Sequence, residues 1–228
     1  MKNIIQEKPT NDLHGRLLHT IKFIDNKDIK NKIVLDIGCG YGWCELNLLK
    51  RGVKKIYATE VTSEDLDTIK KNIKHPKVVY QVANATNLPF PDKSVDTVLC
   101  WEVIEHIPVG TEKQLFSEVH RILKPYGSFY LSTPYKSWPS MVFDPAWWLI
   151  GHRHYSLKEL NQYANSKKMT MSKNTIKGRW WELTGILNMY FSKWILRRNP
   201  LFRSMFYKKI DHEYKQPGFI DIFVKFTK

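Results

Sequence analysis

Cysteine is scarce in this chain of 228 residues, and its three cysteines show no metal-binding or redox spacing. Cys39, Cys44 and Cys100 form no C-x-x-C pair, which argues against a structural zinc site, and their odd number argues against a disulfide framework. Residues 1–15 lack the apolar core of a secretory signal peptide, and no run of about 18 uncharged apolar residues occurs. We therefore predict a cytoplasmic protein that does not cross a membrane.

Acidic residues are sparse in the second half of the chain. Residues 1–114 carry 17 basic and 15 acidic side chains, whereas residues 115–228 carry 19 basic and 7 acidic ones. The formal net charge of +14 therefore lies mostly in the second half. This excess either reflects a lysine-rich solvated surface or favours an anionic partner, such as nucleic acid, an anionic lipid surface or a phosphorylated substrate.

Apolar strand-like runs alternate with helical segments, which predicts an α/β fold with a doubly wound, mostly parallel seven-stranded sheet. We expect a single domain in which a helical, aromatic insertion precedes the last strand. Its parts are an N-terminal helix (1–30), a core (31–177), the insertion (178–216) and the last strand (217–228). The expected strands are residues 32–37, 54–59, 78–82, 95–101, 128–132, 169–176 and 219–226. The expected helices are residues 10–30, 43–51, 63–74, 111–123, 156–166 and 183–198, and residues 134–155 are expected to form a long ordered loop.

A glycine-rich turn follows the first predicted strand. Gly38, Gly40 and Gly42 stand where that strand gives way to a helix, so a ligand can approach the backbone without meeting a Cβ. Glu60 ends the second strand, 22 residues after Gly38. In a doubly wound sheet its carboxylate would lie beside the glycine turn and accept hydrogen bonds from two ribose hydroxyls. The pattern thus predicts a nucleoside ligand, either a dinucleotide or S-adenosylmethionine.

Four motifs stand together in one order: VLDIGCGYG (34–42), YATEV (57–61), NATNLPFPDKSVDTVLCWEVIEHI (84–107) and EVHRILKPYGSFYLSTP (118–134). Through them residues 30–178 resemble class I, Rossmann-like methyltransferases that depend on S-adenosyl-L-methionine. The resemblance implies that Asp36, Gly38 and Gly40 line the methionine end, and that Glu60 holds the ribose.

The same resemblance implies that the Asn84-Ala85 turn meets the adenine and that Trp101 faces the methionine portion. Many relatives have Asp where this chain has Asn84. The Asn side-chain oxygen can still accept a hydrogen bond from the adenine amino group, so we expect this pairing to persist.

Acidic and imidazole side chains follow the fourth predicted strand. If residues 102–106 begin a helix, Glu102, Glu105 and His106 share one face, and together with His152 or His154 they could bind Mg²⁺ or Mn²⁺. The pattern resembles ubiquinone-pathway O-methyltransferases and small-RNA 2′-O-methyltransferases, which implies a metal that lowers the pKa of an acceptor hydroxyl. The alternative is metal-free catalysis with His106 or His154 as the general base.

The insertion at residues 178–216 holds nine aromatic and eight basic residues against three acidic ones. These side chains could stack RNA bases, lie in an anionic membrane interface, or form a lid over the acceptor. We favour a lid that attaches the protein peripherally to a membrane. The predicted function is O-methylation of a small-molecule, lipid-linked or glycan acceptor. The alternatives are a metal-assisted RNA 2′-O-methyltransferase and a non-catalytic module that binds S-adenosylmethionine.

Overall fold

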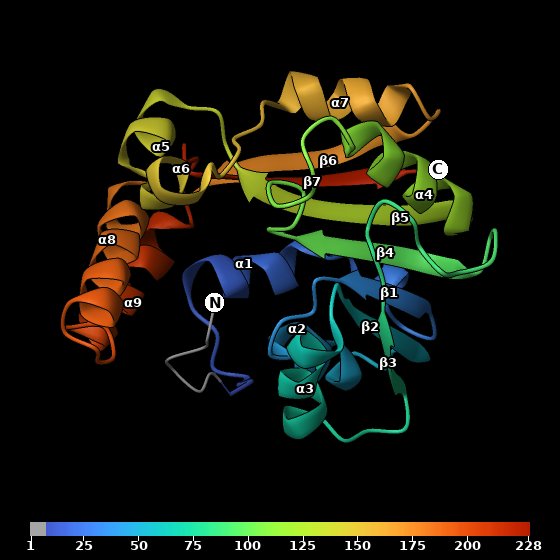
Figure 1. The fold of residues 1–228 in the computed structure, drawn as a ribbon, viewed down its shortest axis with the longest axis horizontal. Coiled ribbons are helices and arrows are strands. Elements are labelled where there is room, and N and C mark those ends of the chain that lie inside the picture. The colour runs from blue at the N-terminus through green and yellow to red at the C-terminus, as the bar shows by residue number, and fades with distance from the viewer. Residues whose placement is uncertain (1–7) are drawn as a thin grey trace.

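The computed structural model describes residues 8–228, which fold around a seven-stranded sheet (Figure 1). The strands are β1 (Ile33–Ile37), β2 (Lys55–Glu60), β3 (Val78–Val82), β4 (Val95–Trp101), β5 (Leu123–Pro134), β6 (Thr170–Lys177) and β7 (Asp221–Thr227). They lie in the order β3-β2-β1-β4-β5-β7-β6. The pairs from β3 to β5 are parallel, and β7 is antiparallel to both of its neighbours. This topology confirms the predicted doubly wound, mostly parallel sheet.

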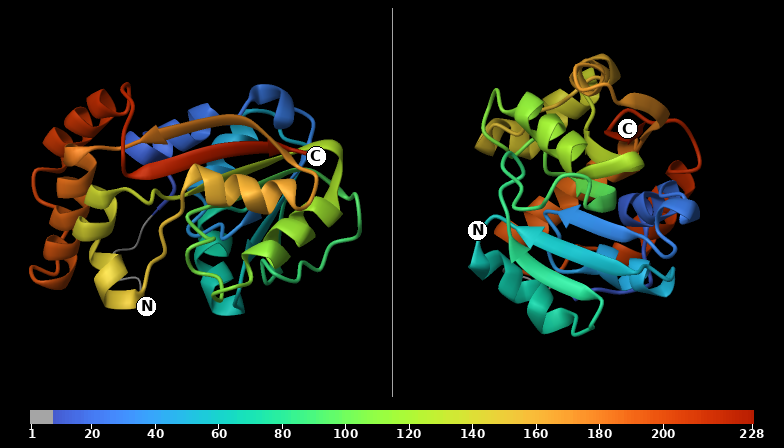
Figure 2. Two further views of the ribbon diagram at one scale, coloured as in Figure 1. Left: turned by 90° about the horizontal axis from the view of Figure 1, so that it is seen from above. Right: turned by 90° about the vertical axis from the view of Figure 1, so that its right-hand side faces the viewer.

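Helices cover both faces of the sheet (Figure 2). Because successive side chains of a strand point to opposite faces, Val34 packs with the side of α1, α2 and α3, whereas Leu35 packs with the side of α4 and α7. The helices are α1 (Gly15–Phe23), a 3-10 turn (Asn26–Asp28), α2 (Trp43–Lys50), α3 (Ser63–Asn72), α4 (Glu112–Ile122), α5 (Trp138–Phe143), α6 (Pro145–Ile150), α7 (Leu157–Asn165), α8 (Trp180–Trp194) and α9 (Arg203–Glu213).

The parallel strands bring their carboxyl ends to one edge of the sheet, where ligands bind in folds of this kind. Ile37 at the end of β1 is paired with Cys100 of β4, and Trp101 at the end of β4 is paired with Ser132 of β5. The glycine turn after β1 and the loop after β4 therefore leave the sheet side by side. Helices α5, α6, α8 and α9 gather beyond this end of the sheet (Figures 1 and 2).

The prediction of one helix over residues 10–30 is too long. Helix α1 ends at Phe23, and the chain then extends so that the Asp25 carboxylate meets Lys225 Nζ at 2.8 Å and Lys173 Nζ at 3.0 Å. These two lysines come from β7 and β6. Ion pairs made by the folded sheet, which local periodicity does not report, therefore decide where the helix ends.

The prediction of a long loop over residues 134–155 is wrong, because this segment contains α5 and α6. Ser137 caps α5 by accepting a hydrogen bond from Ser140 N at 3.2 Å. Proline lies in the first turn of each helix, where its missing N–H costs no internal hydrogen bond. Each helix has six residues, too few turns for an apolar stripe to stand out in the sequence.

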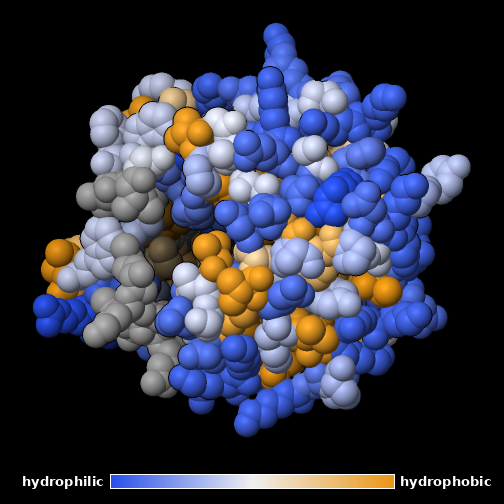
Figure 3. Space-filling view, turned by 45° about the vertical axis from the view of Figure 1, so that its right-hand side comes forward, coloured by the Kyte–Doolittle hydropathy of each residue, from blue (hydrophilic) through white to orange (hydrophobic). Residues whose placement is uncertain are grey.

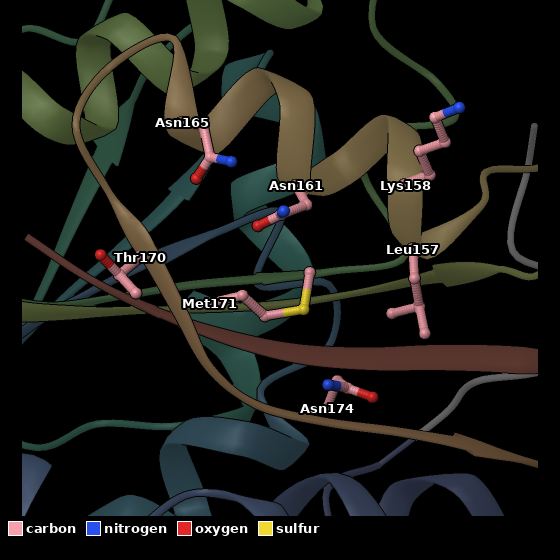
Figure 4. Close-up of a pocket in the computed structure, with 7 residues that line it drawn as sticks. All are labelled: Leu157, Lys158, Asn161, Asn165, Thr170, Met171 and Asn174. Carbon is pink, nitrogen blue, oxygen red and sulfur yellow. The ribbon is translucent and has the colours of Figure 1, made fainter.

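A shallow groove of about 660 Å³ lies between α7 and β6 (Figure 4). Its lining consists of Leu157, Lys158, Asn161, Asn165, Thr170, Met171 and Asn174. It contains no residue predicted for the cofactor or the acceptor, so it is not the candidate site. Within residues 8–228, no helix is long and apolar enough to cross a membrane.

Candidate active site

Two glycines shape the turn after β1 in different ways. Gly38 and Gly40 both have positive φ, +75° and +57°, which disfavours any residue with a side chain. A Cβ on Gly38 would lie 2.5 Å from Val103 Cγ2, whereas a Cβ on Gly40 would meet no atom of residues 8–228 within 4 Å. At Gly38 the turn thus packs against the loop after β4, whereas at Gly40 it has space beside it. On the face shown in Figure 3, apolar side chains border one side of a hollow.

Glu60 lies at the end of β2 and faces the glycine turn. Its Oε1 accepts a hydrogen bond from Gly40 N at 2.6 Å. Burial raises the pKa of Glu60, and the bond from Gly40 partly offsets that effect. The structure thus places Glu60 beside the turn, as predicted, while its contact with a ribose stays a prediction.

Asp36, near the end of β1, forms a buried acidic pair with Glu45 of α2. Among residues 8–228, Asp36 Oδ1 and both carboxyl oxygens of Glu45 have no hydrogen-bond partner. Burial raises the pKa of Asp36 to about 7 and that of Glu45 well above its usual range, where the charge of Asp36 raises it further. An orphaned buried carboxyl oxygen suits a cationic ligand, and the ammonium and sulfonium groups of S-adenosylmethionine are cations. The residues present therefore fit this cofactor.

The Asn84-Ala85 turn follows β3, where the resemblance puts the adenine. Asn84 Oδ1 accepts hydrogen bonds from Thr86 N at 2.9 Å and Thr86 Oγ1 at 2.8 Å, while Ala85 is buried. The Asn84 oxygen would have to give up one of these bonds to accept from adenine. Trp101 is buried at the end of β4, with its ring centroid 6.3 Å from that of Tyr130. The ligand contacts of these residues stay predictions.

The conditional helix at residues 102–106 is absent: the segment forms a series of turns, and Glu102 has a φ of +55°. The Glu102 carboxylate accepts hydrogen bonds from Ser132 Oγ at 2.6 Å and Arg16 Nη1 at 2.8 Å. These contacts turn Glu102 toward α1. Glu102 and Glu105 are therefore not neighbours on one helix face, and Glu102 is not part of the cluster of ligand atoms that Glu105 joins.

Glu105, His106 and His152 form a cluster in which one ligand atom from each lies within 4.8 Å of the others. His106 Nε2 is 3.3 Å from His152 Nε2, and Glu105 Oε1 is 3.6 Å from the same His152 atom. The Glu105 side chain is fully buried, and its Oε1 has no hydrogen-bond partner within residues 8–228. Burial raises the pKa of Glu105 and lowers that of His106. The structure thus brings three of the predicted ligands together, while their binding of a metal stays a prediction.

Arg153 and Asp144 hold the cluster in place. The Arg153 guanidinium donates to Ile104 O at 2.7 Å and Glu105 O at 3.3 Å, which ties His152 to the loop after β4. Asp144 Oδ2 lies 3.1 Å from His152 Nδ1. Because a carboxylate only accepts, His152 Nδ1 is the donor of this hydrogen bond, and its Nε2 faces the cluster.

His154 lies outside this cluster. It is buried, its ring centroid is 5.3 Å from that of Trp147, and its Nε2 is 3.4 Å from Asp144 Oδ2. Burial lowers its pKa. The predictions of His154 as a general base or fourth metal ligand therefore gain no geometric support here, since the ring packs inside the protein.

Arg16 and Asp144 are among the residues of the site that carried no functional prediction. Arg16 of α1 pairs with Glu102, and its Nη1 also lies 3.8 Å from Asp221 Oδ1, but a single arginine in a short helix gives no sequence signal. The sequence pattern around Asp144 could have indicated its role. It is the one acidic residue between Glu118 and Glu159, and it stands eight positions before His152.

Comparison with known proteins decides the class of the central region. Residues 35–131 match the family described as Methyltransferase domain. The solved structure of an S-adenosylmethionine-dependent methyltransferase from Mesorhizobium loti has a TM-score of 0.65 to this chain, at 13% sequence identity. The match covers 92% of this chain and 96% of that one. Residues 35–131 form a class I methyltransferase domain.

Curated relatives align with the methyltransferase domain over part of their own length. A protein of Mycolicibacterium smegmatis named as a probable S-adenosylmethionine-dependent methyltransferase is 33% identical over 101 residues, which cover 44% of this chain and 37% of that protein. A mitochondrial ubiquinone biosynthesis O-methyltransferase of Dictyostelium discoideum is 27% identical over 143 residues, which cover 54% and 44%. The chain thus spans less than half the length of these relatives. Asp36, Glu60 and Glu105 lie inside the methyltransferase domain, whereas His152 lies beyond it.

Proposed function

We propose that this chain transfers the methyl group of S-adenosylmethionine to a hydroxyl oxygen of a small-molecule, lipid-linked or glycan acceptor. The observation that carries the proposal is the contact of Gly38 with Val103, because it sets the glycine turn directly against the loop that bears Glu105 and His106. A cofactor at the turn and an acceptor at the cluster would therefore be neighbours. The Dictyostelium relative, named as an O-methyltransferase, supports oxygen as the acceptor atom.

On the cofactor side, the chain offers a carboxyl for a cation and a carboxylate for hydroxyls. Asp36 Oδ1 would accept from the methionine ammonium, and Glu60 would exchange its bond from Gly40 N for the ribose hydroxyls. The bound cofactor supplies an electrophilic methyl group on its sulfonium. Since the leaving thioether needs no proton, the protein's main task is to align the acceptor and accept its proton.

On the acceptor side, His106 is the proposed proton acceptor. It is the exposed member of the cluster, so an acceptor hydroxyl can reach its imidazole. Its lowered pKa keeps the ring neutral at neutral pH and able to take a proton. His152, held by its contact with Asp144, places Nε2 at 3.3 Å from His106 Nε2, where a neutral His152 ring would accept a hydrogen bond from protonated His106.

A divalent cation is the alternative occupant of the same cluster. Two imidazole nitrogens face each other at 3.3 Å, and the buried Glu105 Oε1 is orphaned beside them. A cation held by these three atoms would satisfy that oxygen and bind the acceptor hydroxyl. Two nitrogen donors suit Mn²⁺ better than Mg²⁺, which prefers oxygen ligands.

A methyl-transfer assay tests the proposal. The chain is incubated with methyl-labelled S-adenosylmethionine and with lipid, glycan and small-molecule fractions, and label in an acid-stable, base-stable product is expected from one of them. His106→Ala should lower the rate about a hundredfold or more, as expected for loss of a general base. The exposed His75, outside the cluster, provides the matched control His75→Ala, which should leave the rate unchanged. Full activity of His106→Ala would refute the role of His106.

Treatment with a chelator distinguishes metal-free catalysis by His106 from a cluster that holds a divalent cation. If activity survives exhaustive treatment with a chelator, His106 works without a metal. If activity disappears and Mn²⁺ restores it, the cluster holds a cation. Binding of S-adenosylhomocysteine without methylation of any fraction would instead support the non-catalytic module. Transfer to RNA, with binding that falls steeply as salt rises, would support the 2′-O-methyltransferase alternative.

A further inference from the structure

The outward face of α8 is apolar where a surface helix normally presents polar side chains. Trp180, Leu187, Phe191 and Trp194 follow one another at intervals of seven, four and three residues, so they share one side of the helix. All four are exposed, with 50% of Trp180 and 51% of Phe191 accessible to solvent. We propose that this face and the basic segment after it dock on the surface of an anionic lipid bilayer.

The apolar surface continues on both sides of α8. Toward α5, the Phe143 ring meets that of Trp180 at 6.4 Å between centroids, and the exposed Trp138 lies beyond it, 6.2 Å from Phe143. Past the other end of α8, Ile195 and Phe202 are more than half exposed. A single exposed apolar residue would need no explanation, but a surface that runs through α5, α8 and the link to α9 does.

Basic side chains accompany this surface. Residues 183–210 contain six basic side chains and no Asp or Glu. The ion pairs of the described chain, residues 8–228, include none of these six, and five of the six residues are exposed. Cations without an acidic partner, next to exposed Trp and Phe, suit an interface with anionic headgroups. The six are Lys193, Arg197, Arg198, Arg203, Lys208 and Lys209.

Other occupants fit the surface less well. A second copy of the chain would bring the same six cations face to face, and like charges repel. RNA would pair with the cations and stack on the rings, but the exposed aliphatic side chains of Leu187, Ile195 and Leu196 offer bases no stacking surface. Insertion across the bilayer is excluded for α8, because its 15 residues extend about 22 Å and a hydrocarbon core is about 30 Å thick. The helix would therefore lie in the plane of the interface.

Vesicle flotation tests this proposal with the whole chain and without any cofactor. We expect the chain to float with vesicles of phosphatidylcholine mixed with phosphatidylglycerol, and to float less well as salt increases. The double change Arg197→Gln and Arg198→Gln should weaken binding about thirtyfold, which corresponds to about 1 kcal/mol for each cation lost. Phe191→Ser should weaken it roughly tenfold, because about half of the ring is exposed and available for burial in lipid.

The matched control substitutions lie in helix α3, outside the proposed lipid-binding surface, and in an exposed loop. Lys70→Gln with Lys71→Gln removes two exposed charges, and Val109→Ser removes one exposed apolar side chain. Both should leave flotation unchanged. The proposal is overturned if the wild-type chain fails to float at low salt, if it floats equally with pure phosphatidylcholine, or if the α3 control weakens binding as much as the arginine pair does.

Two further outcomes would assign the surface to another occupant and refute the lipid proposal. The first is a dimer in sedimentation that Phe191→Ser dissociates, without vesicle binding. The second is RNA binding that competes vesicles away and loses affinity in the arginine variant. Failure of vesicle binding would leave the methyl-transfer assay unaffected, so the two proposals fail independently.

Discussion

The glycine turn offers a prediction in which two neighbouring, similar substitutions give different results. Gly38→Ala and Gly40→Ala each place a Cβ on a backbone with positive φ. For an L-residue this conformation costs about 1 kcal/mol. The surroundings then separate the two variants, because Gly38 is packed against Val103 and Gly40 faces open space.

The magnitudes follow from this geometry. A Cβ only 2.5 Å from Val103 Cγ2 must displace that side chain, and overpacking of this kind costs about 2 kcal/mol in addition to the backbone strain. Gly38→Ala should therefore lower the free energy of unfolding by about 3 kcal/mol, and Gly40→Ala by about 1 kcal/mol. Combining Gly38→Ala with Val103→Ala removes the obstructing methyl group. The double variant should be more stable than the sum of the single effects by about 1 kcal/mol.

Gly40→Ala, the variant expected to lose less stability, should be the one with a marked effect on ligand binding. At Gly40 the added methyl group projects toward the side proposed for the cofactor, so Gly40→Ala should weaken S-adenosylhomocysteine binding about tenfold or more although the fold is nearly intact. Urea unfolding followed by tryptophan fluorescence and calorimetric titration measure the two effects. Equal destabilisation by both variants would refute the packing argument. Wild-type affinity in Gly40→Ala would refute the placement of the cofactor.

Three further predictions concern stability and are measured by urea unfolding. Arg16→Gln should cost about 2 kcal/mol, less than for a fully buried pair because Arg16 is partly exposed. Burial raises the pKa of Asp221, so this cost should decrease as the pH is lowered and protonation neutralises the carboxylate that Arg16 no longer pairs. Ser156→Ala should cost about 1 kcal/mol by removing the capping box of α7. Asp25→Asn should destabilise the protein at neutral pH but hardly near about pH 2. Burial raises the pKa of Asp25, but the hydrogen bonds from Lys225 and Lys173 outweigh burial and lower this pKa to about 2. The stabilisation that the Asp25 carboxylate contributes is therefore lost as the pH falls through that range.

The sequence predicted the sheet well because its strands are short, β-branched and clearly bounded. Residues 78–82 and 95–101 were predicted with the bounds that the structure has, and Pro or Gly stands near the ends of most other strands. Helix α7 (Leu157–Asn165) was predicted to within one residue at each end, and Ser156 and Glu159 form a reciprocal capping box at its start. Local chemistry decided these elements.

The errors arose where distant residues decide the backbone. Glu102 leaves helical geometry because Arg16, 86 positions away, and Ser132, 30 positions away, share its carboxylate. The sequence placed Glu105, His106 and His152 together through a family resemblance, and periodicity alone would not have joined residues 46 positions apart. Asp144 was missed because it lies in the segment predicted to be a loop. Its role depends on α5 and α6 bringing it to His152.

The central claim, that the glycine turn and Glu60 hold S-adenosylmethionine, is tested most directly by calorimetric titration with S-adenosylhomocysteine. The account predicts one binding site per chain and an affinity about thirtyfold lower in Glu60→Gln, because replacing a charged acceptor of ribose hydroxyls costs about 2 kcal/mol. Glu64→Gln, an exposed acid four positions on in α3, should bind like the wild type. Absence of binding by the wild-type chain, or equal affinity in Glu60→Gln, would contradict the account.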